Sequence, residues 1–298
     1  MSRALSPSTD KPYGVARVAS VWQIARSSFY FSKARQNRAE PPAKRRGPKT
    51  KYTDAELTEH IRQVIRESPF HGEGHRKIWV RLRSRDIRSS KPRVLRLMRE
   101  AQLLGPTRQP AMVTPNPHAG TIITEQPNQM WGTDATATVT LSDGQVTVFA
   151  TIDHCTAECL GIHVVKRATR FEALEPIRQA VKGVFGDFRA NVAQNLKLRH
   201  DHGSQYMSND FQKEIRFLGL ESSPAFVRQP EGNGCIERFF RTLKEQLLWV
   251  RHFDTVEELR QALFEFKETY NRNWLIERLG FKSPRQARED LLALGVAA

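Results

Sequence analysis

Three acidic residues fall where predicted elements would hold their side chains in place. Asp134 lies in a Thr- and Val-rich stretch that is typical of a strand, and Asp201 follows the short strand candidate Asn195–Leu198. Glu237 is separated from Asp201 by 35 residues and lies near the start of an amphipathic helix. Carboxylate oxygens are the ligands that Mg²⁺ and Mn²⁺ prefer. If the fold brings the three together, they suit divalent-metal chemistry.

The helix that contains Glu237 has two distinct faces. An Asn233-Gly234 turn signal precedes it. Its apolar stripe recurs at spacings of four, three and four residues: Ile236, Phe240, Leu243 and Leu247. On an adjoining face Arg241 and Lys244 follow Glu237 at i+4 and i+7. Taken alone, this row is also what a solvated ladder of ion pairs would look like.

The elements around the three acids follow the order β, β, β, α, β, α, β, α from residue 128 onwards. Strands are predicted at 131–140, 146–153, 159–166, a short stretch ending at His200, and 220–225. Helices are predicted at 171–185, at 208–218 and around Glu237. A turn at Ser142-Asp143-Gly144 would join the first two strands as a hairpin. The pattern indicates an α/β domain.

The sequence motifs around the three acids resemble those of a known protein family. Asp134 stands in Trp131-Gly132-Thr133-Asp134, and Asp201 stands in Asp201-His202-Gly203-Ser204-Gln205-Tyr206. Glu237 precedes Arg238-Phe239, and Tyr270-Asn271-Arg272 with Leu279–Pro284 follow downstream. With these motifs in order over about residues 10 to 290, the chain resembles the DDE transposases (OrfB type) of bacterial insertion sequences. These have an integrase catalytic core related to that of retroviral integrases.

The resemblance implies a ribonuclease H-like core with a mixed five-stranded sheet and helices, preceded by small all-α helix-turn-helix units. It implies that Asp134, Asp201 and Glu237 are both the catalytic residues and the ligands of two Mg²⁺ (or Mn²⁺) ions. Water would be the nucleophile in strand nicking, and a 3′-hydroxyl in strand transfer. Lys244 and Arg241 would face the DNA end, with His202 and Gln205 close by.

The positive charge is concentrated in the first third of the chain. The whole chain carries a net charge of +15. Residues 1–110 contain 25 Lys and Arg against 9 Asp and Glu, a net +16, so the other 188 residues are close to neutral. A basic head on a near-neutral body is typical of a protein that binds a polyanion such as DNA.

Composition and proline content divide the chain into five segments. They are a helix-turn-helix at 1–34, a basic linker at 35–53, a three-helix DNA-binding domain at 54–104, a Pro-rich linker at 105–127, and a catalytic core with a helical extension at 128–290. Predicted DNA contacts in the first three are Arg26, Lys44, Arg45, Arg46, Arg76 and Lys77. A plain helical hairpin at 13–33 and a solvated tether at 35–52 explain the same residues without DNA.

Other titratable residues were weighed against the three acids. Asp153 also lies in the strand region and would point at the same site, but no family motif surrounds it. Cys155 and Cys159 with His154 and His163 lack a second close pair, so we interpret the cysteines as buried rather than zinc-binding. No apolar stretch reaches the length of a membrane span. We expect a cytoplasmic, nucleoid-associated bacterial protein without a membrane partner.

Three functions follow from this sequence. The leading hypothesis is a transposase that binds the terminal repeats of its element, cleaves strands and transfers them. The others are a metal-dependent nuclease of the same fold without strand transfer, and an inactive DNA-binding regulator. The resemblance also implies double-stranded DNA as partner, a homo-oligomer on DNA, and a separately encoded upstream helix-turn-helix protein as a further partner. The segment at 254–290 would complete the core or contact DNA or another subunit.

Overall fold

The computed structural model describes residues 3–37, 50–105, 124–225 and 233–296. The chain forms two compact units, residues 1–51 and residues 52–298. Much of the two predicted linkers, at 38–49 and 106–123, lies outside the described residues. In the described part of the chain, no helix combines the length and apolarity needed to cross a membrane.

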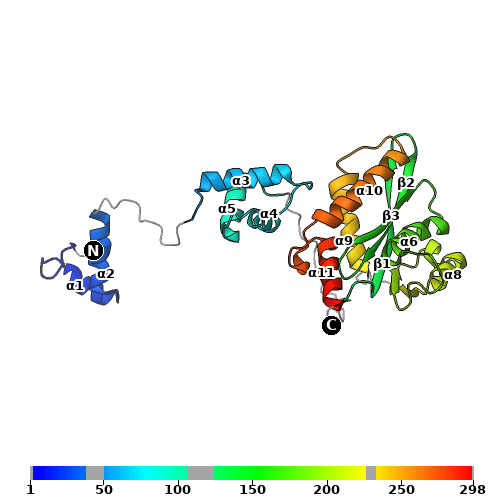
Figure 1. Cartoon of the computed structure of the whole chain (residues 1–298). Helices are drawn as coiled ribbons and strands as arrows, with labels where there is room; N and C mark the ends of the chain where they lie inside the picture. Colours follow the sequence, from blue (N-terminus) through cyan, green and yellow to red (C-terminus); the bar gives the residue numbers. More distant parts are fainter. Residues whose placement is uncertain (1–2, 38–49, 106–123, 226–232, 297–298) are drawn as a thin grey trace. The chain divides into compact units, whose positions relative to one another are not determined.

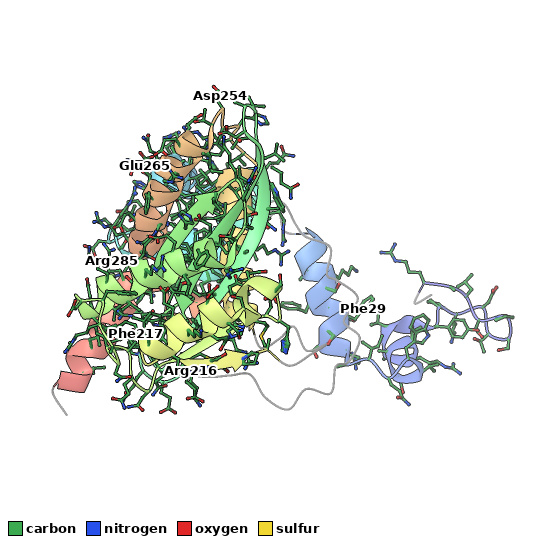
Figure 2. The ribbon with its side chains drawn as sticks, turned by 90° about the vertical axis from the view of Figure 1, so that its right-hand side faces the viewer. Phe29, Arg216, Phe217, Asp254, Glu265 and Arg285 are labelled. Carbon is green, nitrogen blue, oxygen red and sulfur yellow. The ribbon has the colours of Figure 1, made fainter. Side chains whose placement is uncertain are left out.

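The first unit contains the predicted helical hairpin. Helix α1 (Gly14–Val21) and helix α2 (Arg26–Asn37) are joined by a turn in which Gln23 adopts a left-handed backbone conformation. Phe29 projects from α2 with its ring edge-on to Tyr30, at a centroid distance of 5.6 Å (Figure 2). Ala19 is buried, whereas most other described side chains of the unit are exposed.

The second unit begins with three helices that match the predicted patterns, α3 (Asp54–Glu67), α4 (His75–Arg83) and α5 (Lys91–Glu100). Thr53 and Glu56 form a reciprocal capping box that starts α3. Ser90 caps α5, whose Pro92 fits the first helical turn. The three helices share an apolar core that includes Leu57, Ile61, Ile78, Leu82 and Met98.

The rest of the second unit is built on a five-stranded mixed sheet. The strands are β1 (Met130–Thr140), β2 (Gly144–Asp153), β3 (Cys159–Val165), β4 (Lys197–His200) and β5 (Glu221–Pro224). Their spatial order is β3-β2-β1-β4-β5, antiparallel among the first three and parallel from β1 to β5. This arrangement confirms the predicted ribonuclease H-like fold.

Helices cover both faces of the sheet (Figure 1). One face packs on α6 (Arg170–Phe185), α7 (Ser204–Met207) and α8 (Asn209–Phe217) through Trp131, Phe149 and Leu198. The other face packs on α9 (Gly234–Leu243) and α10 (Val256–Asn273) through alternating residues of β2 and β3. Arg216 and Phe217 end α8 at the outer surface (Figure 2).

Side chains from α6 and α10 bond to the backbone of the edge strand β3. The amide of Asn271 accepts from Cys159 N at 2.9 Å and donates to Cys159 O at 2.8 Å. Gln179 accepts from Ile162 N at 3.1 Å, and Arg260 donates to Val164 O at 3.4 Å. Tyr270 Oη also donates to Ala157 O at 3.2 Å. These contacts favour core completion as the role of the Tyr270-Asn271 motif.

The chain closes with a 3₁₀ turn (Glu277–Leu279) and helix α11 (Pro284–Val296). Arg285 and Arg288 of α11 face the buried carboxylate of Glu158, with N···O separations of 3.8 Å and 3.4 Å. Arg285, which is labelled in Figure 2, also pairs with Glu268 of α10. The last helix is thereby tied to the core.

Candidate active site

Asp134 and Asp201 occupy equivalent positions on neighbouring parallel strands. The β1–β4 pairing joins Met130 to Lys197 and Gly132 to Arg199, an offset of 67 residues. The same offset separates Asp134 from Asp201, two residues beyond the last pair. Because side chains alternate along a strand, both acids belong to the same face of the sheet as that pair. The register therefore brings the two aspartates side by side at one end of β4.

Glu237 reaches this site because the first turn of α9 is seated on β1. Ile236, Phe240 and Leu243 are buried against the sheet, which leaves Glu237 on the exposed side. Asn233, just before the helix, is buried and its amide donates to Thr133 O at 3.5 Å, next to Asp134 in sequence. The helix thus brings its acid to the strand that holds Asp134.

The absence of a side chain at Gly132 allows α9 to pack closely on β1. A Cβ at Gly132 would lie 2.7 Å from His154 Nε2 and 3.2 Å from Asn233 Oδ1. A side chain there would push away the ring of His154 or the residue that starts α9. Burial among Arg199 and Arg278 lowers the pKa of His154 to about 4, so its ring is neutral.

The charges of the site act on Asp134. Burial, together with the nearby negative charges of Asp201 and Glu237, raises the pKa of its carboxyl to about 6. A hydrogen bond from Ala135 N and the positive charge of Lys244 act in the opposite direction. Partial burial also raises the pKa of Glu237. The three predicted acids and Lys244 therefore lie within electrostatic reach of one another.

Asp201 differs from Asp134 in its surroundings. It is exposed, and its Oδ1 accepts from Gly203 N at 2.8 Å, which folds the loop into a tight turn. A Cβ on Gly203 would lie 2.8 Å from that oxygen and 2.6 Å from Gln205 Nε2. The predicted neighbour Gln205 thus lies beside Asp201, and His202 is exposed. Tyr206 is buried, and its burial raises the pKa of its hydroxyl, as do the charges of Asp134 and Asp201.

A small hollow of about 300 Å³ opens beside the acids of β1 and α9. Its lining includes Asp134, Glu237, Arg241, Lys244 and Trp249. Among the described residues, no three His, Cys, Asp or Glu side chains are arranged so that they could hold a metal ion. The residue types still fit one, since carboxylate oxygens are ligands of Mg²⁺ and the negative charges of Asp201 and Glu237 help to raise the pKa of the half-buried Asp134. Asp201 or Glu237 would have to move toward Asp134 on binding.

The alternative acid Asp153 has a structural role. It is fully buried, and its carboxylate accepts from Asn128 N, Thr156 N and Thr156 Oγ1 at 2.8–3.0 Å. These bonds fix the turn after β2. The cysteines at 155 and 159 are free and buried, as expected.

The residues predicted to contact DNA have varied surroundings. Arg241 lines the hollow and pairs with Glu245 at 3.4 Å, while Arg26 is exposed at the first turn of α2. Arg76 donates to both oxygens of Glu277, and Lys77 Nζ lies 3.0 Å from the ring centroid of Trp274. Arg76 and Lys77 would each have to give up these interactions in order to contact DNA. Lys44, Arg45 and Arg46 lie outside the described residues.

Sequence reasoning missed the π-helical turn η2 (Lys244–Leu248) that follows α9, and Trp249 beyond it. It used Asn233 only as a turn signal and did not foresee its bond to β1. The apolar stripe of α9 could not have revealed η2, because a π-turn is a local change in hydrogen bonding without a sequence pattern of its own.

Family models match most of the second unit. Residues 124–230 and residues 218–284 match two models described as integrase core domain, and residues 51–111 match an HTH-like domain. The first two cover the sheet, α9 and α10. The third covers the three helices α3 to α5.

Two relatives from Escherichia coli illustrate the similarity. One is an uncharacterized 48.2 kDa protein of insertion element IS2A, 28% identical over 290 residues, which cover 95% of this chain and 66% of that protein. The other is transposase InsD for insertion element IS2A/D/F/H/I/K, 28% identical over 248 residues, which cover 80% of this chain and 81% of InsD. The chain thus spans just under two thirds of the longer relative.

Solved structures with a similar course include the catalytic core domain of BIV integrase, with 18% identity and a TM-score of 0.42 over 57% of this chain and 99% of that one. The HTLV-2 integrase catalytic core domain in complex with magnesium also has 18% identity and a TM-score of 0.42. That match covers 55% of this chain and 98% of the integrase chain. Strand order and family models, rather than these distant likenesses, define the class: an integrase core preceded by an HTH-like domain. Residues 124–284 thus match the integrase core, and the chain is similar over most of its length to these insertion-element proteins.

Proposed function

We propose that this chain binds the terminal repeats of an insertion element and catalyses divalent-metal-dependent cleavage and transfer of DNA strands. The observation that carries the proposal is that Asp201, at the end of β4, and Glu237, in the first turn of α9, both act electrostatically on Asp134 of β1, as does Lys244. Double-stranded DNA, both element ends and target, is the proposed substrate.

In this mechanism the three carboxylates hold two Mg²⁺ or Mn²⁺ ions. When bound, such ions activate the attacking oxygen and stabilise the leaving one in an in-line displacement at phosphorus. In strand nicking, water attacks and a DNA 3′-hydroxyl leaves. In strand transfer that 3′-hydroxyl attacks a target phosphodiester, so one P–O bond forms as another breaks.

The chain's own residues position the reactants. The shared register of β1 and β4 sets the aspartates side by side, and the seating of α9 adds Glu237. Lys244 and Arg241 line the same hollow and supply positive charge for the phosphate backbone. The HTH-like domain at 51–111 would supply sequence recognition, with the first unit and the basic segment at 44–46 adding phosphate contacts. Joining two ends implies at least two chains on the DNA.

A strand-transfer assay tests the proposal. Wild type and Glu237→Gln are compared on linear DNA that carries the ends of the encoding element, with Mg²⁺, using a labelled 3′-end to detect nicked and joined products. Asp210→Asn, an exposed acid of α8 paired with Arg170, is the matched control. We expect wild type and the control to join ends, and Glu237→Gln to bind DNA without forming products.

Other outcomes would favour the alternatives. Nicked DNA without joined products would support a nuclease without strand transfer. Binding of the ends without any product, in wild type and variant alike, would support a DNA-binding regulator. Equal product from wild type and Glu237→Gln would contradict the assigned site.

A further inference from the structure

Trp249 is an exposed aromatic residue beside two of the three acids, Asp134 and Glu237. Its side chain is 68% exposed, and that of Val250 is 59% exposed. Trp249 lines the hollow that also contains Asp134, Glu237 and Lys244. A large aromatic ring left in water next to a reaction centre is the kind of apolar surface that marks a binding site.

The π-turn η2 places this ring on the face of the helix that holds the site. In an uninterrupted α-helix the face of Glu237, Arg241 and Lys244 would continue with Leu248. Instead Trp249 N donates to Lys244 O at 2.9 Å, an i→i+5 bond that adds one residue to the turn. Leu248 packs on the apolar core, and Trp249 takes its place beside the acids.

Arginine and lysine side chains lie near the ring, together with acids such as Glu237 and Glu245. Arg241 and Lys244 precede it on the same helical face and line the same hollow. Trp249 also lines a second hollow, of about 1100 Å³, whose lining includes Arg238 and Arg278. An aromatic platform flanked by cations is the pattern by which proteins hold a nucleobase while binding its phosphates.

We propose that Trp249 stacks on an unpaired nucleobase of the DNA end held at the active site. The base must be unpaired and unstacked on one side, because neighbours cover both faces of a base inside a duplex. Stacking would hold the end nucleotide open and fix the adjacent phosphate against the carboxylates. The inference rests on the proposed function, since it takes the DNA end as the ligand.

Fluorescence anisotropy without divalent metal tests the inference. Two duplexes carrying the element end differ only at an unpaired 3′-terminal nucleotide, which has a thymine base in one and is abasic in the other. Stacking on one aromatic side chain corresponds to about 5- to 100-fold in affinity. We expect wild type to prefer the thymine duplex by that factor, Trp249→Phe to keep much of the preference, and Trp249→Ala to lose it.

Controls separate this inference from the proposed function. Val250→Ala should keep the preference, as should Glu237→Gln, which forms no product. Equal affinity of wild type for both duplexes, or an unchanged preference in Trp249→Ala, would overturn the role of Trp249 alone. A fall in oligomeric state of Trp249→Ala by light scattering, without a change in base preference, would assign the ring to a subunit contact instead. Failure of wild type to bind either duplex would overturn both proposals.

Discussion

The two aspartates of the site share a register but differ in environment. Asp134 lies inside the sheet, partly buried, with a pKa raised to about 6. Asp201 lies one strand away, exposed, with its carboxylate bonded to the backbone of its own loop. Strand pairing explains why they lie near each other, and the end of β4 at His200 explains why only Asp134 lies within a paired strand.

This difference indicates how the site would assemble. Asp134 lies in a paired strand, where burial makes its negative charge unfavourable. Asp201 is exposed to water, but its carboxylate is bonded to its own loop rather than directed at Asp134. A divalent cation would correct both conditions at once, because it neutralises the first carboxylate and draws in the second. The following predictions test the difference between the two.

The largest expected effect is on the reaction. Asp134→Asn and Asp201→Asn should each lower strand-transfer activity by roughly 10³-fold, because loss of a metal ligand removes several kcal/mol of transition-state stabilisation. Product formation on labelled element ends measures this. Asp153→Asn should instead lower thermal stability, since its carboxylate fixes a buried turn. Comparable activity in either of the first two variants would remove that residue from the site.

Gly203→Ala should weaken the Asp201 side of the site selectively. The added methyl would lie 2.8 Å from Asp201 Oδ1, so the carboxylate must shift. We expect the Mg²⁺ concentration for half-maximal activity to rise about 10- to 100-fold, as for changes that misorient a metal ligand. Gly183→Ala, in α6 with open space around it, is the control. An unchanged Mg²⁺ dependence would show that the turn does not aim Asp201.

Asp134→Asn should stabilise the metal-free protein at high pH. The carboxyl has a pKa of about 6 when folded against an ordinary value of 3.8, so the folded state holds its proton more tightly. The stability from this group is therefore complete below about pH 3.8 and is lost as the pH rises through 6. At pH 8 the Asn variant should gain at most about 3 kcal/mol in urea unfolding with chelator present, and little at pH 4.

The matched Asp201→Asn variant should show no such gain, because its carboxyl is already in water. Added Mg²⁺ should stabilise wild type at pH 8 and leave Asp134→Asn nearly unchanged. A gain that is independent of pH would point to packing rather than charge.

The smallest expected effect concerns Lys244. Its positive charge holds the pKa of Asp134 down, so Lys244→Gln should raise that pKa. Mn²⁺ binding should then require a higher pH, by a few tenths of a unit for a charge interaction of well under 1 kcal/mol. Titration calorimetry between pH 5 and 8 measures the shift. Lys244→Arg keeps the charge and should behave as wild type does.

Much of this fold could be predicted from the sequence because its signals are local. The alternating apolar pattern of 146–153 and the caps at Thr53 and Ser90 lie within a few residues of what they determine. Residue types and family motifs also indicated Asp134, Asp201 and Glu237 as candidate site residues. The π-turn before Trp249 could not be predicted because it has no sequence pattern of its own. The contact of Lys77 with Trp274 could not be predicted because the two residues are far apart in the sequence.

The side chains that cover β3 have a consequence for assembly. An edge strand with unpaired backbone groups can add a strand from another chain. Here Asn271, Gln179 and Arg260 already occupy backbone groups of that edge. A second copy of this protein that extended the sheet at β3 would therefore have to displace these side chains, which disfavours association by that route.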